Sequence, residues 1–356
     1  GGSVHPPRVT PRNAAGCASL TGWTLPKMSS HNMSWIQYPS RVSTAVEDVI
    51  ASQSVVSRCV HVYVALFVPV SLVTGLFNLT TFLRGRARLG GLDMLLSVLT
   101  VTNMLVTLLS LTAISRPDYL ATTNLSCAVL SFLANVCYFN AQYVQLAMLF
   151  AFLLQGPSSC LRAATSGAQR PAAGLAALGG CAFCSSLGVV ALLGTSRELD
   201  KTTLCQVDPL TAWPEYEIVK VSLGFGVALV LKLAFFILLI VQLAWRAAPP
   251  QRDTASAHLV VLAIALIMFV CRLLYNMALL QRARLKLQRD IGLPRDELLM
   301  NLAELVLFGE SCVNSLATLF LHKPCRLALL SIPARLTHRC RRGEASNSFS
   351  LKRVGS

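Results

Sequence analysis

Four ionisable side chains, Lys232, Arg272, Glu304 and Glu310, fall inside long apolar stretches of this sequence. A charge inside a bilayer is costly, so such residues are candidates for function. Arg272 lies about nine residues, or about 13 Å, before the end of its stretch. Glu304 and Glu310 lie about 9 and about 18 Å from the start of the next stretch. The two acids therefore bracket Arg272 in depth.

The apolar stretches that carry these side chains are long enough to cross a membrane. Hydrophobic residues make up 54% of the 356 residues, charged residues make up 13%, and the mean hydropathy is +0.59. A soluble domain typically has about 25% charged residues, and a spanning helix needs about 20 apolar ones. No stretch alternates with period two, which argues against a transmembrane β-barrel. We predict seven transmembrane α-helices at 59–83, 94–115, 127–154, 174–196, 217–245, 258–280 and 298–322.

The chain divides into three parts around this all-α seven-helix bundle. Residues 1–57 are polar and contain several prolines, and we expect them to form a disordered extracellular tail. Residues 58–322 form the bundle, and 323–356 form a short amphipathic helix on the membrane surface followed by a cytoplasmic tail. The net charge of +15 resides in loops and tail, where anionic lipids explain it. We therefore expect membrane lipids, and no nucleic acid, among the partners.

Two independent features predict an N-terminus outside the cell. Asn32 and Asn124 begin Asn-x-Ser glycosylation sequons, and an exterior N-terminus places both outside. Most loop cations and the basic tail then lie in the cytoplasm, as the positive-inside rule requires. A third sequon, at Asn78, falls inside the first span, where we expect no glycan. The loop between the sixth and seventh spans dissents, with five cations between residues 282 and 295. Either the sixth helix extends beyond the membrane, or this basic patch faces a ligand.

Residues at fixed places in these spans resemble the rhodopsin-like (class A) G-protein-coupled receptors. Asn78, in Gly-Leu-Phe-Asn-Leu, matches the asparagine of that family's first helix. Asn103 stands where the second helix of the family has an aspartate, and Asn314, in Cys-Val-Asn-Ser-Leu-Ala-Thr, resembles the start of Asn-Pro-x-x-Tyr. Cys127, at the start of the third span, and Cys205, in the loop after the fourth, match two cysteines that form a disulfide in the family. The resemblance implies the same disulfide here, in an oxidising exterior.

The switch motifs of the family are largely replaced. Residues 151–153 read Ala-Phe-Leu where the family has Asp-Arg-Tyr, and residues 271–274 read Cys-Arg-Leu-Leu where it has Cys-Trp-x-Pro. The chain is therefore similar to a divergent, orphan-type receptor that keeps the scaffold and loses most of the activation residues. Asn103 in place of the aspartate predicts weak sensitivity to sodium, unless Glu310 substitutes for the missing carboxylate.

The resemblance also implies a partner for Arg272, which takes the place of the tryptophan in the sixth helix. The sixth and seventh helices are neighbours in that family, and Glu310 lies four residues before Asn314. We therefore hypothesise an Arg272–Glu310 pair, since the guanidinium fork suits a carboxylate. The pair could be a lock that only fixes helix packing, a ligand or switch element, or not form at all. We expect Lys232 to extend toward the cytoplasm.

A ligand pocket and a lipidated tail are further expectations. Polar residues of the third helix could line a pocket, or could hydrogen-bond between helices, which is their commoner use. The predicted pocket comprises Asn135, Tyr138, Gln142, Arg272 and Glu304. The aspartate of amine receptors is replaced by Ala134, so we do not expect an aminergic ligand. Cys325 and Cys340 are candidates for palmitoylation or free cytoplasmic thiols.

We therefore predict a receptor-like protein of the plasma membrane, an orphan G-protein-coupled receptor. It would transmit the binding of an unknown extracellular ligand to a heterotrimeric G protein or arrestin. The alternatives are a seven-helix transporter or channel that uses the buried charges, and a non-signalling scaffold on the receptor fold. The sequence has no phosphate-binding glycine loop, no His/Cys metal spacing and no Gly-x-Ser-x-Gly. We therefore expect neither an enzyme nor a bound cofactor or metal.

Overall fold

Long helices make up nearly all of the structure that can be described. The computed structural model of the chain describes residues 54–84, 91–114, 122–154, 171–193, 202–203, 208, 212–244, 252–290 and 292–331. Seven helices in these ranges are long and apolar enough to cross a membrane. The chain is therefore a multi-pass membrane protein, as the sequence predicts.

The seven spans follow one another along the chain with few irregularities. The first, Ser54–Arg84, passes through a π-helical turn, η1 (Tyr63–Phe67), into α2 (Val68–Arg84). The fifth joins α7 (Pro214–Val221), the π-helical turn η4 (Ser222–Gly226) and α8 (Val227–Ala244). The others are α3 (Gly91–Ile114), α4 (Asn124–Leu154), α6 (Pro171–Val190) with its 3-10 end η3 (Ala191–Leu193), α9 (Arg252–Leu287) and α10 (Pro294–Leu321).

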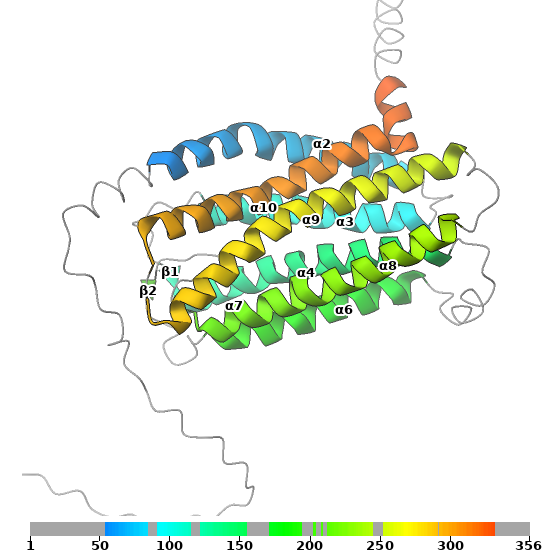
Figure 1. The fold of residues 1–356 in the computed structure, drawn as a ribbon. Helices are drawn as coiled ribbons and strands as arrows, with labels where there is room; N and C mark the ends of the chain where they lie inside the picture. Colours follow the sequence, from blue (N-terminus) through cyan, green and yellow to red (C-terminus); the bar gives the residue numbers. More distant parts are fainter. Residues whose placement is uncertain are drawn as a thin grey trace, which may run out of the picture. The chain divides into compact units, whose positions relative to one another are not determined.

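Two short strands mark one end of the bundle. β1 (Thr122–Thr123) directly precedes α4, and β2 (Thr202–Thr203) lies between α6 and α7 in the chain. The two strands pair antiparallel, with Thr122 opposite Thr203. The last turn of α9 and the first turn of α10 lie at the same end (Figure 1). We call this end the strand end, and the end at which α2 and α10 finish the opposite end.

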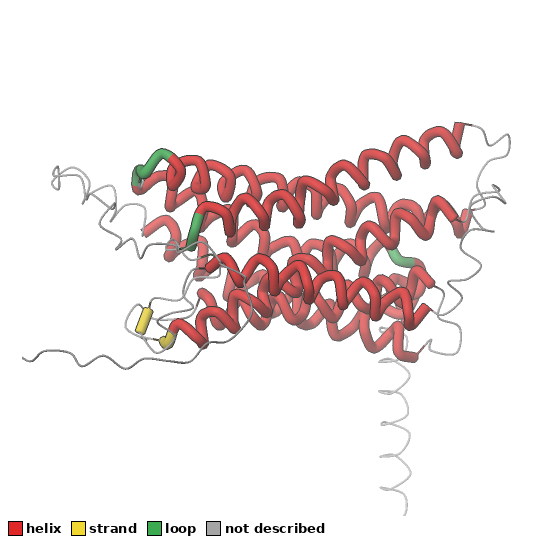
Figure 2. The backbone as a smooth tube through the Cα atoms, turned by 90° about the horizontal axis from the view of Figure 1, so that it is seen from below, coloured by secondary structure: helices red, strands yellow, loops and turns green. Residues whose placement is uncertain are grey.

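α4 and α10 are the most enclosed helices of the bundle. Half of the apolar window of the third and of the seventh span is buried, compared with 11% for the fifth. α4 packs against α3, α6, α8 and α9, and α10 packs against α2, α3 and α9. Figures 1 and 2 show the helices side by side along one bundle, with the two short strands at one end. Since α9 touches both enclosed helices, inward side chains of these three helices meet in the middle of the bundle.

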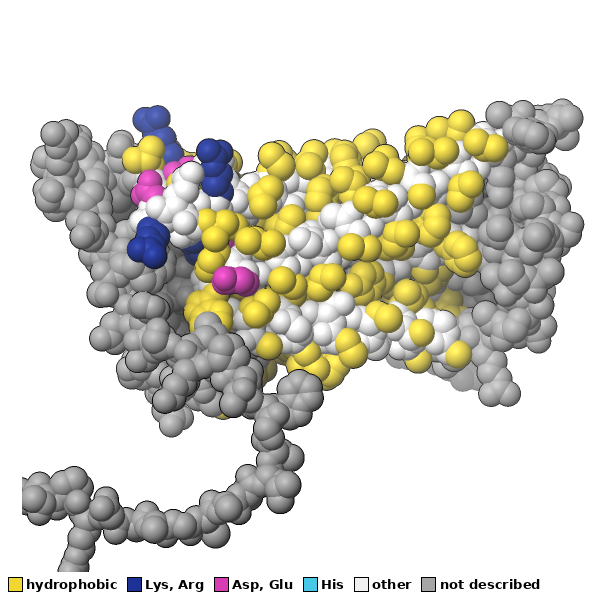
Figure 3. Space-filling view, turned by 60° about the horizontal axis from the view of Figure 1, so that its bottom comes forward, with side chains coloured by type: hydrophobic (Ala, Val, Ile, Leu, Met, Phe, Trp, Pro, Cys, Tyr) yellow, Lys and Arg dark blue, Asp and Glu magenta, His cyan; other side chains and the backbone are white. Residues whose placement is uncertain are grey.

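The outward faces of the helices are apolar, as a hydrocarbon surrounding requires. Figure 3 shows hydrophobic side chains over the length of the helices, with charged side chains gathered toward the strand end. On α8, Val230, Leu233 and Ile237 are each more than half exposed. Such exposure is unfavourable in water and favourable in lipid, because a spanning helix satisfies its own backbone and presents only side chains.

A tight turn joins α9 to α10 and sets them antiparallel. Arg289 and Gly292 have φ angles of 58° and 81°, the left-handed region that glycine tolerates best. The Asp290 carboxylate accepts a hydrogen bond from the Gly292 N–H at 3.1 Å. The Asp296 carboxylate accepts one from the Leu293 N–H at 2.8 Å, which caps the start of α10. The turn therefore defines the register between two helices that carry the candidate site.

The predicted spans agree with the observed helices, except that the sixth is longer than predicted. It was predicted to end at 280, whereas α9 continues to Leu287 and includes Arg282, Arg284 and Lys286. The sixth helix is therefore longer than predicted, as the first explanation of the basic loop requires, whereas its extension beyond the membrane stays a prediction. Of the predicted surface helix, 323–331 is helical and the remainder lies outside the described residues.

The orientation in the membrane stays a prediction. Asn32 lies outside the described residues, and the side chain of Asn124, the first residue of α4, is not described. Asn78, in the third sequon, is fully buried, and its Nδ2 donates to the Ser315 carbonyl at 2.9 Å. An amide in this position is inaccessible to a glycosylating enzyme in the folded protein.

Candidate functional site

Arg272 of α9 and Glu310 of α10 form the ion pair predicted from the sequence. Arg272 Nε lies 3.0 Å from Glu310 Oε2, and Nη2 lies 3.0 Å from Oε1. Two roughly parallel hydrogen bonds therefore join the guanidinium fork to the carboxylate. Both side chains are buried. The predicted contact is confirmed, and the alternative without contact is wrong.

α4 binds the remaining arm of the guanidinium. Arg272 Nη1 donates to Gln142 Oε1 at 2.9 Å and to the Tyr138 carbonyl at 3.0 Å. The guanidinium carbon also lies 4.5 Å from the centre of the Tyr138 ring, within the range of a cation–π interaction. Asn276 Nδ2 donates to the Tyr138 hydroxyl at 3.0 Å. The pair thus ties α4, α9 and α10 together through a connected polar network.

A second charged cluster surrounds Asp208, nearer the strand end. Lys220 Nζ of α7 lies 2.5 Å from Asp208 Oδ1, and the Tyr216 hydroxyl donates to the same oxygen at 2.7 Å. The Tyr275 hydroxyl of α9 donates to the other oxygen. Asn135 Nδ2 of α4 donates to the Tyr216 hydroxyl at 3.2 Å. Asp208 precedes α7 in the chain and is only 1% exposed, so this residue is drawn into the bundle.

The pKa of the Asp208 carboxyl is lowered, although the side chain is buried. Burial alone raises this pKa, but the charge of Lys220 and the hydrogen bonds from Lys220, Tyr275 and Tyr216 outweigh it. Asp208 is therefore a charged and fully bound counter-ion. All three donors lie on helices, so they hold Asp208 against the bundle.

A third cluster, at the rim of the strand end, contains cations from the loop between the sixth and seventh spans, which does not follow the positive-inside rule in the predicted orientation. Lys286 pairs with Glu217 of α7 and donates to the Ala212 carbonyl at 3.0 Å. Arg282 donates to the Asp208 carbonyl at 3.1 Å, and its Nε lies 3.8 Å from Glu217. These two cations therefore point inward and have protein partners, whereas Arg284 on the same helix is exposed.

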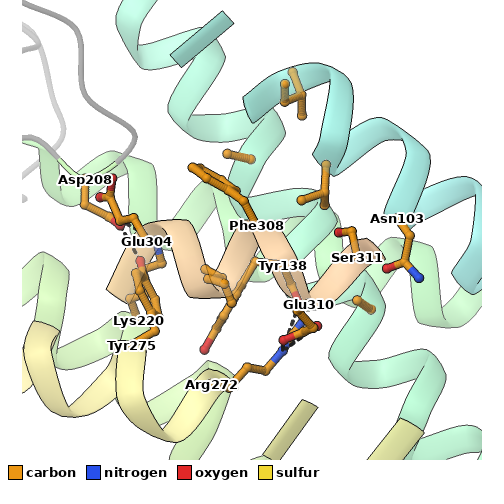
Figure 4. Close-up of a pocket in the computed structure, with 15 residues that line it drawn as sticks. Asn103, Tyr138, Asp208, Lys220, Arg272, Tyr275, Glu304, Phe308, Glu310 and Ser311 are labelled. Atoms are coloured by element: carbon orange, nitrogen blue, oxygen red, sulfur yellow. Dashed lines mark hydrogen bonds and ion pairs between the residues drawn. The ribbon is translucent and has the colours of Figure 1, made fainter. Parts of the chain in front are cut away.

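An internal cavity lies between the Arg272–Glu310 pair and the Asp208 cluster (Figure 4). Side chains of α3, α4, α7, α9 and α10 line it. Its charged lining residues are Asp208, Lys220, Arg272, Glu304 and Glu310. The cavity leaves about 40 Å³ to the centres of water molecules, which is room for a few waters. It is thus a small chamber with a mainly apolar lining that carries a few charged side chains, and one of these, Asp208, precedes α7 in the chain.

The structure brings together three of the five residues predicted to form a pocket. Tyr138, Arg272 and Glu304 line the cavity. Asn135 and Gln142 lie behind this lining, and each hydrogen-bonds to a residue of a charged cluster. Sequence reasoning missed Asp208, Lys220 and Tyr275 as lining residues.

The sequence contained a signal for some of the charged residues in the Asp208 cluster and the rim cluster. Glu217 and Lys220 lie three residues apart near the start of the fifth span, and Arg282 and Lys286 lie four apart, so each couple shares a helix face. Charged residues that share a face at a helix end point to an interhelical contact. Asp208 carried no such signal, because it lies outside any periodic segment.

The other polar residues predicted inside the membrane have different surroundings. Asn103 lines the cavity, whereas Asn314 is fully buried and neither of its amide atoms has a hydrogen-bond partner within the described structure. Lys232 is half-buried on α8 and makes no hydrogen bond or ion pair with a described residue. The site therefore centres on α9 and α10 rather than on α8.

At the opposite end, His322 connects the end of α10 to the start of α3. Its Nε2 lies 3.0 Å from Asp93 Oδ1, and its Nδ1 lies 3.5 Å from Cys325 Sγ. Cys325 is fully buried, and burial, with the nearby Asp93, raises the pKa of its thiol to about 12. Because the thiol is buried, the structure argues against palmitoylation at Cys325, which stays an untested prediction. Cys340 lies outside the described residues.

Cys127, at the start of α4, is buried and is not among the free cysteines, whereas its predicted partner Cys205 lies outside the described residues. Within the described ranges, no three His, Cys, Asp or Glu side chains are grouped as a metal site requires.

No protein-family model matches this chain, and a search of curated proteins finds no sequence similar to it.

Proposed function

We propose that this protein is a rhodopsin-like receptor of the plasma membrane that binds a small extracellular ligand in the cavity near the strand end. The observation that carries the proposal is the cavity itself, with charged lining residues from three helices and from the segment that precedes α7. A mainly apolar chamber with a few charged groups, at the meeting point of several helices, is a place where a ligand can change how those helices pack. The likeness of Asn78, Asn103 and Asn314 to the motifs of the receptor family supports the class.

In this proposal the strand end faces the outside of the cell. The sequons at Asn32 and Asn124 and the basic tail support this orientation. A disulfide between Cys127 and Cys205 follows from the same orientation. The pairing of β1 with β2 supports it, because Thr123 and Thr203 stand four and two residues before these cysteines. Such a bridge would tie the chain after β2 to the start of α4, and the hydrogen bonds to Asp208 hold that residue at the cavity.

The Arg272–Glu310 pair is the element through which a ligand acts on the helices. Both residues line the cavity, and Arg272 also binds α4. A ligand group that competes for either partner weakens the link between α9 and α10 and favours another arrangement of the two helices. On the cytoplasmic side, the partner is a heterotrimeric G protein or arrestin. Its contact must differ from the family's, since residues 151–153 read Ala-Phe-Leu.

The test is recruitment of cytoplasmic partners in living cells. The full chain, tagged for surface detection, is screened against a ligand library with proximity reporters for each G-protein class and for arrestin. A ligand that recruits a partner through the wild-type chain should fail with Glu310→Gln and act normally with Glu215→Gln, an exposed acid on α7. No nucleotide exchange in any G-protein class and no arrestin recruitment, at normal surface expression, would overturn the proposal and leave a non-signalling scaffold.

A transporter or channel is the second candidate, because charged residues lie at successive depths from the rim to Glu310. Charges aligned along a bundle can form a polar path for an ion or solute. The two candidates separate by flux through the purified protein in liposomes. Movement of an ion or solute that stops in Glu310→Gln would favour transport over reception.

A further inference from the structure

The charged residues that line the cavity do not balance. Asp208 pairs with Lys220, and Arg272 pairs with Glu310. Glu304 is the fifth charged residue of the lining, and it forms no hydrogen bond or ion pair with any residue in the described part of the chain. The cavity therefore has one carboxylate without a partner.

The acids also outnumber the cations when the cluster at the rim of the strand end is counted together with the cavity. The cations of the cavity and rim are Lys220, Arg272, Arg282 and Lys286, and the acids are Asp208, Glu217, Glu297, Glu304 and Glu310. Four cations thus face five acids. Lys232 is left out of this count because it does not line the cavity. The charges that act on it are those of Arg272 and Glu310, so it is not a partner of Glu304.

The cations nearest to Glu304 are engaged elsewhere. Lys220 binds Asp208 at 2.5 Å, and Arg282 lies between Glu217 at 3.8 Å and Glu297 at 3.6 Å. Figure 4 shows Glu304 beside Asp208 and Lys220, on the strand-end side of the cavity. Neither Lys220 nor Arg282 is therefore free to neutralise Glu304.

The wall next to Glu304 is apolar. Leu307 and Phe308 follow it on α10, within about one turn, and line the same cavity. Val106 and Leu109 of α3 add to this lining. A ligand that fits these surroundings has a positively charged head and a short apolar body.

We propose that the cavity binds an organic ammonium ion, with the ammonium on Glu304 and the apolar body against Leu307 and Phe308. The inference rests on the proposed function and deepens it by naming the class of ligand. Glu304 is only partly buried, but a carboxylate in an apolar wall without a counter-ion is unfavourable, and an ammonium supplies both charge and N–H donors. An anionic ligand would instead add to the excess negative charge. The sequence argued against an aminergic ligand because Ala134 replaces an aspartate of the third helix, but here the carboxylate comes from α10.

The test measures binding to the full chain in lipid nanodiscs, through the rise in the midpoint of thermal unfolding that a ligand causes. The probes are propylammonium, butylammonium and hexylammonium, with the matched alcohols and carboxylates. The ammonium ions should raise the midpoint of the wild-type protein, and the alcohols and carboxylates should not. Glu304→Gln should weaken binding at least about tenfold, since a hydrogen bond to a charged group is lost. Glu304→Asp should keep part of the binding, and Glu215→Gln should keep all of it.

Three outcomes would overturn the inference. Alcohols or carboxylates could shift the midpoint as much as the ammonium ions, or the ammonium shift could persist in Glu304→Gln. No probe could bind while Glu304→Gln raises the midpoint by itself, which would identify a proton as the occupant. If Glu304→Gln fails to fold, two measurements still test the inference. They are the difference between ammonium ions and alcohols on the wild-type protein, and the weakened ammonium binding of Glu304→Asp.

The failure of this inference can be told apart from the failure of the proposed function. Ammonium binding that depends on Glu304, without recruitment of any cytoplasmic partner, would sink the receptor proposal alone. Recruitment by an anionic ligand, without ammonium binding, would sink this inference alone.

Discussion

Replacing Glu310 by glutamine should destabilise the bundle, because it leaves a guanidinium buried without its counter-ion. Arg272 is 3% exposed and donates through Nε and Nη2 to the carboxylate of Glu310. After the substitution, Gln142 and the Tyr138 carbonyl still accept from Nη1. The positive charge nevertheless has no partner, and an arginine cannot lose its proton in a protein. Removing one partner of a buried pair costs about 3–5 kcal/mol.

The opposite substitution, Arg272→Gln, should cost less. It leaves the Glu310 carboxylate without a hydrogen-bond partner in the described structure, but a carboxyl group can become neutral by binding a proton. The double variant Arg272→Gln/Glu310→Gln removes both charges. Its destabilisation should therefore be smaller than the sum of the two single effects by about 2 kcal/mol.

The assay is thermal unfolding of the purified full chain at one fixed scan rate. Glu310→Gln should lower the midpoint by on the order of 10 °C, and the exposed control Glu215→Gln should leave it within about 1 °C. The reasoning is refuted if Glu310→Gln unfolds with the control, or if the two single effects simply add in the double variant. The exchange Arg272→Glu/Glu310→Arg gives a second readout, because it should recover surface expression that each single exchange loses.

Three further predictions concern other parts of the molecule. Since the pKa of Asp208 lies below its ordinary value of 3.8, its stabilisation is complete above that pH and is lost as the pH falls further. The midpoint of Asp208→Asn against pH should lack this acid step, and an unchanged step would contradict the assignment. Gly224→Ala places a Cβ against the Tyr138 ring and should cost about 1–3 kcal/mol. Gly188→Ala, with nothing within 4 Å, should unfold like the wild type, and equal midpoints of the two variants would refute the packing argument. Because Cys325 is buried, N-ethylmaleimide should alkylate it only after unfolding, and mass-spectrometric detection of the adduct in the folded protein would count against that burial.

Much of the fold could be predicted because lipid imposes a strong constraint on sequence. A spanning segment must be apolar for about 20 residues whatever its neighbours are. The third span was predicted at 127–154, and α4 runs from Asn124 to Leu154. The sixth span was predicted too short, because the last turns of α9 carry Arg282 and Lys286. These charges signal the end of an apolar stretch, although both side chains are buried against other helices.

The sequence predicted a contact of the candidate site only where two residues lie at similar depth on neighbouring helices. Arg272 and Glu310 lie on consecutive helices joined by a short turn, so depth along each helix brought them together. The partners of Lys220 could not be found in this way. One of them, Asp208, lies outside the helices, and no periodicity predicts where such a residue will lie.

The sequence by itself therefore determined the seven spans and the depth of each buried charge, because span length and helical rise do not depend on tertiary neighbours. Only the tertiary structure decided which charges pair and that Glu304 is left without a partner. Pairing depends on how helices distant in sequence are rotated toward one another, and on the position of Asp208, outside the helices, beside Lys220. Those arrangements result from packing of the whole bundle, which no local stretch of residues encodes.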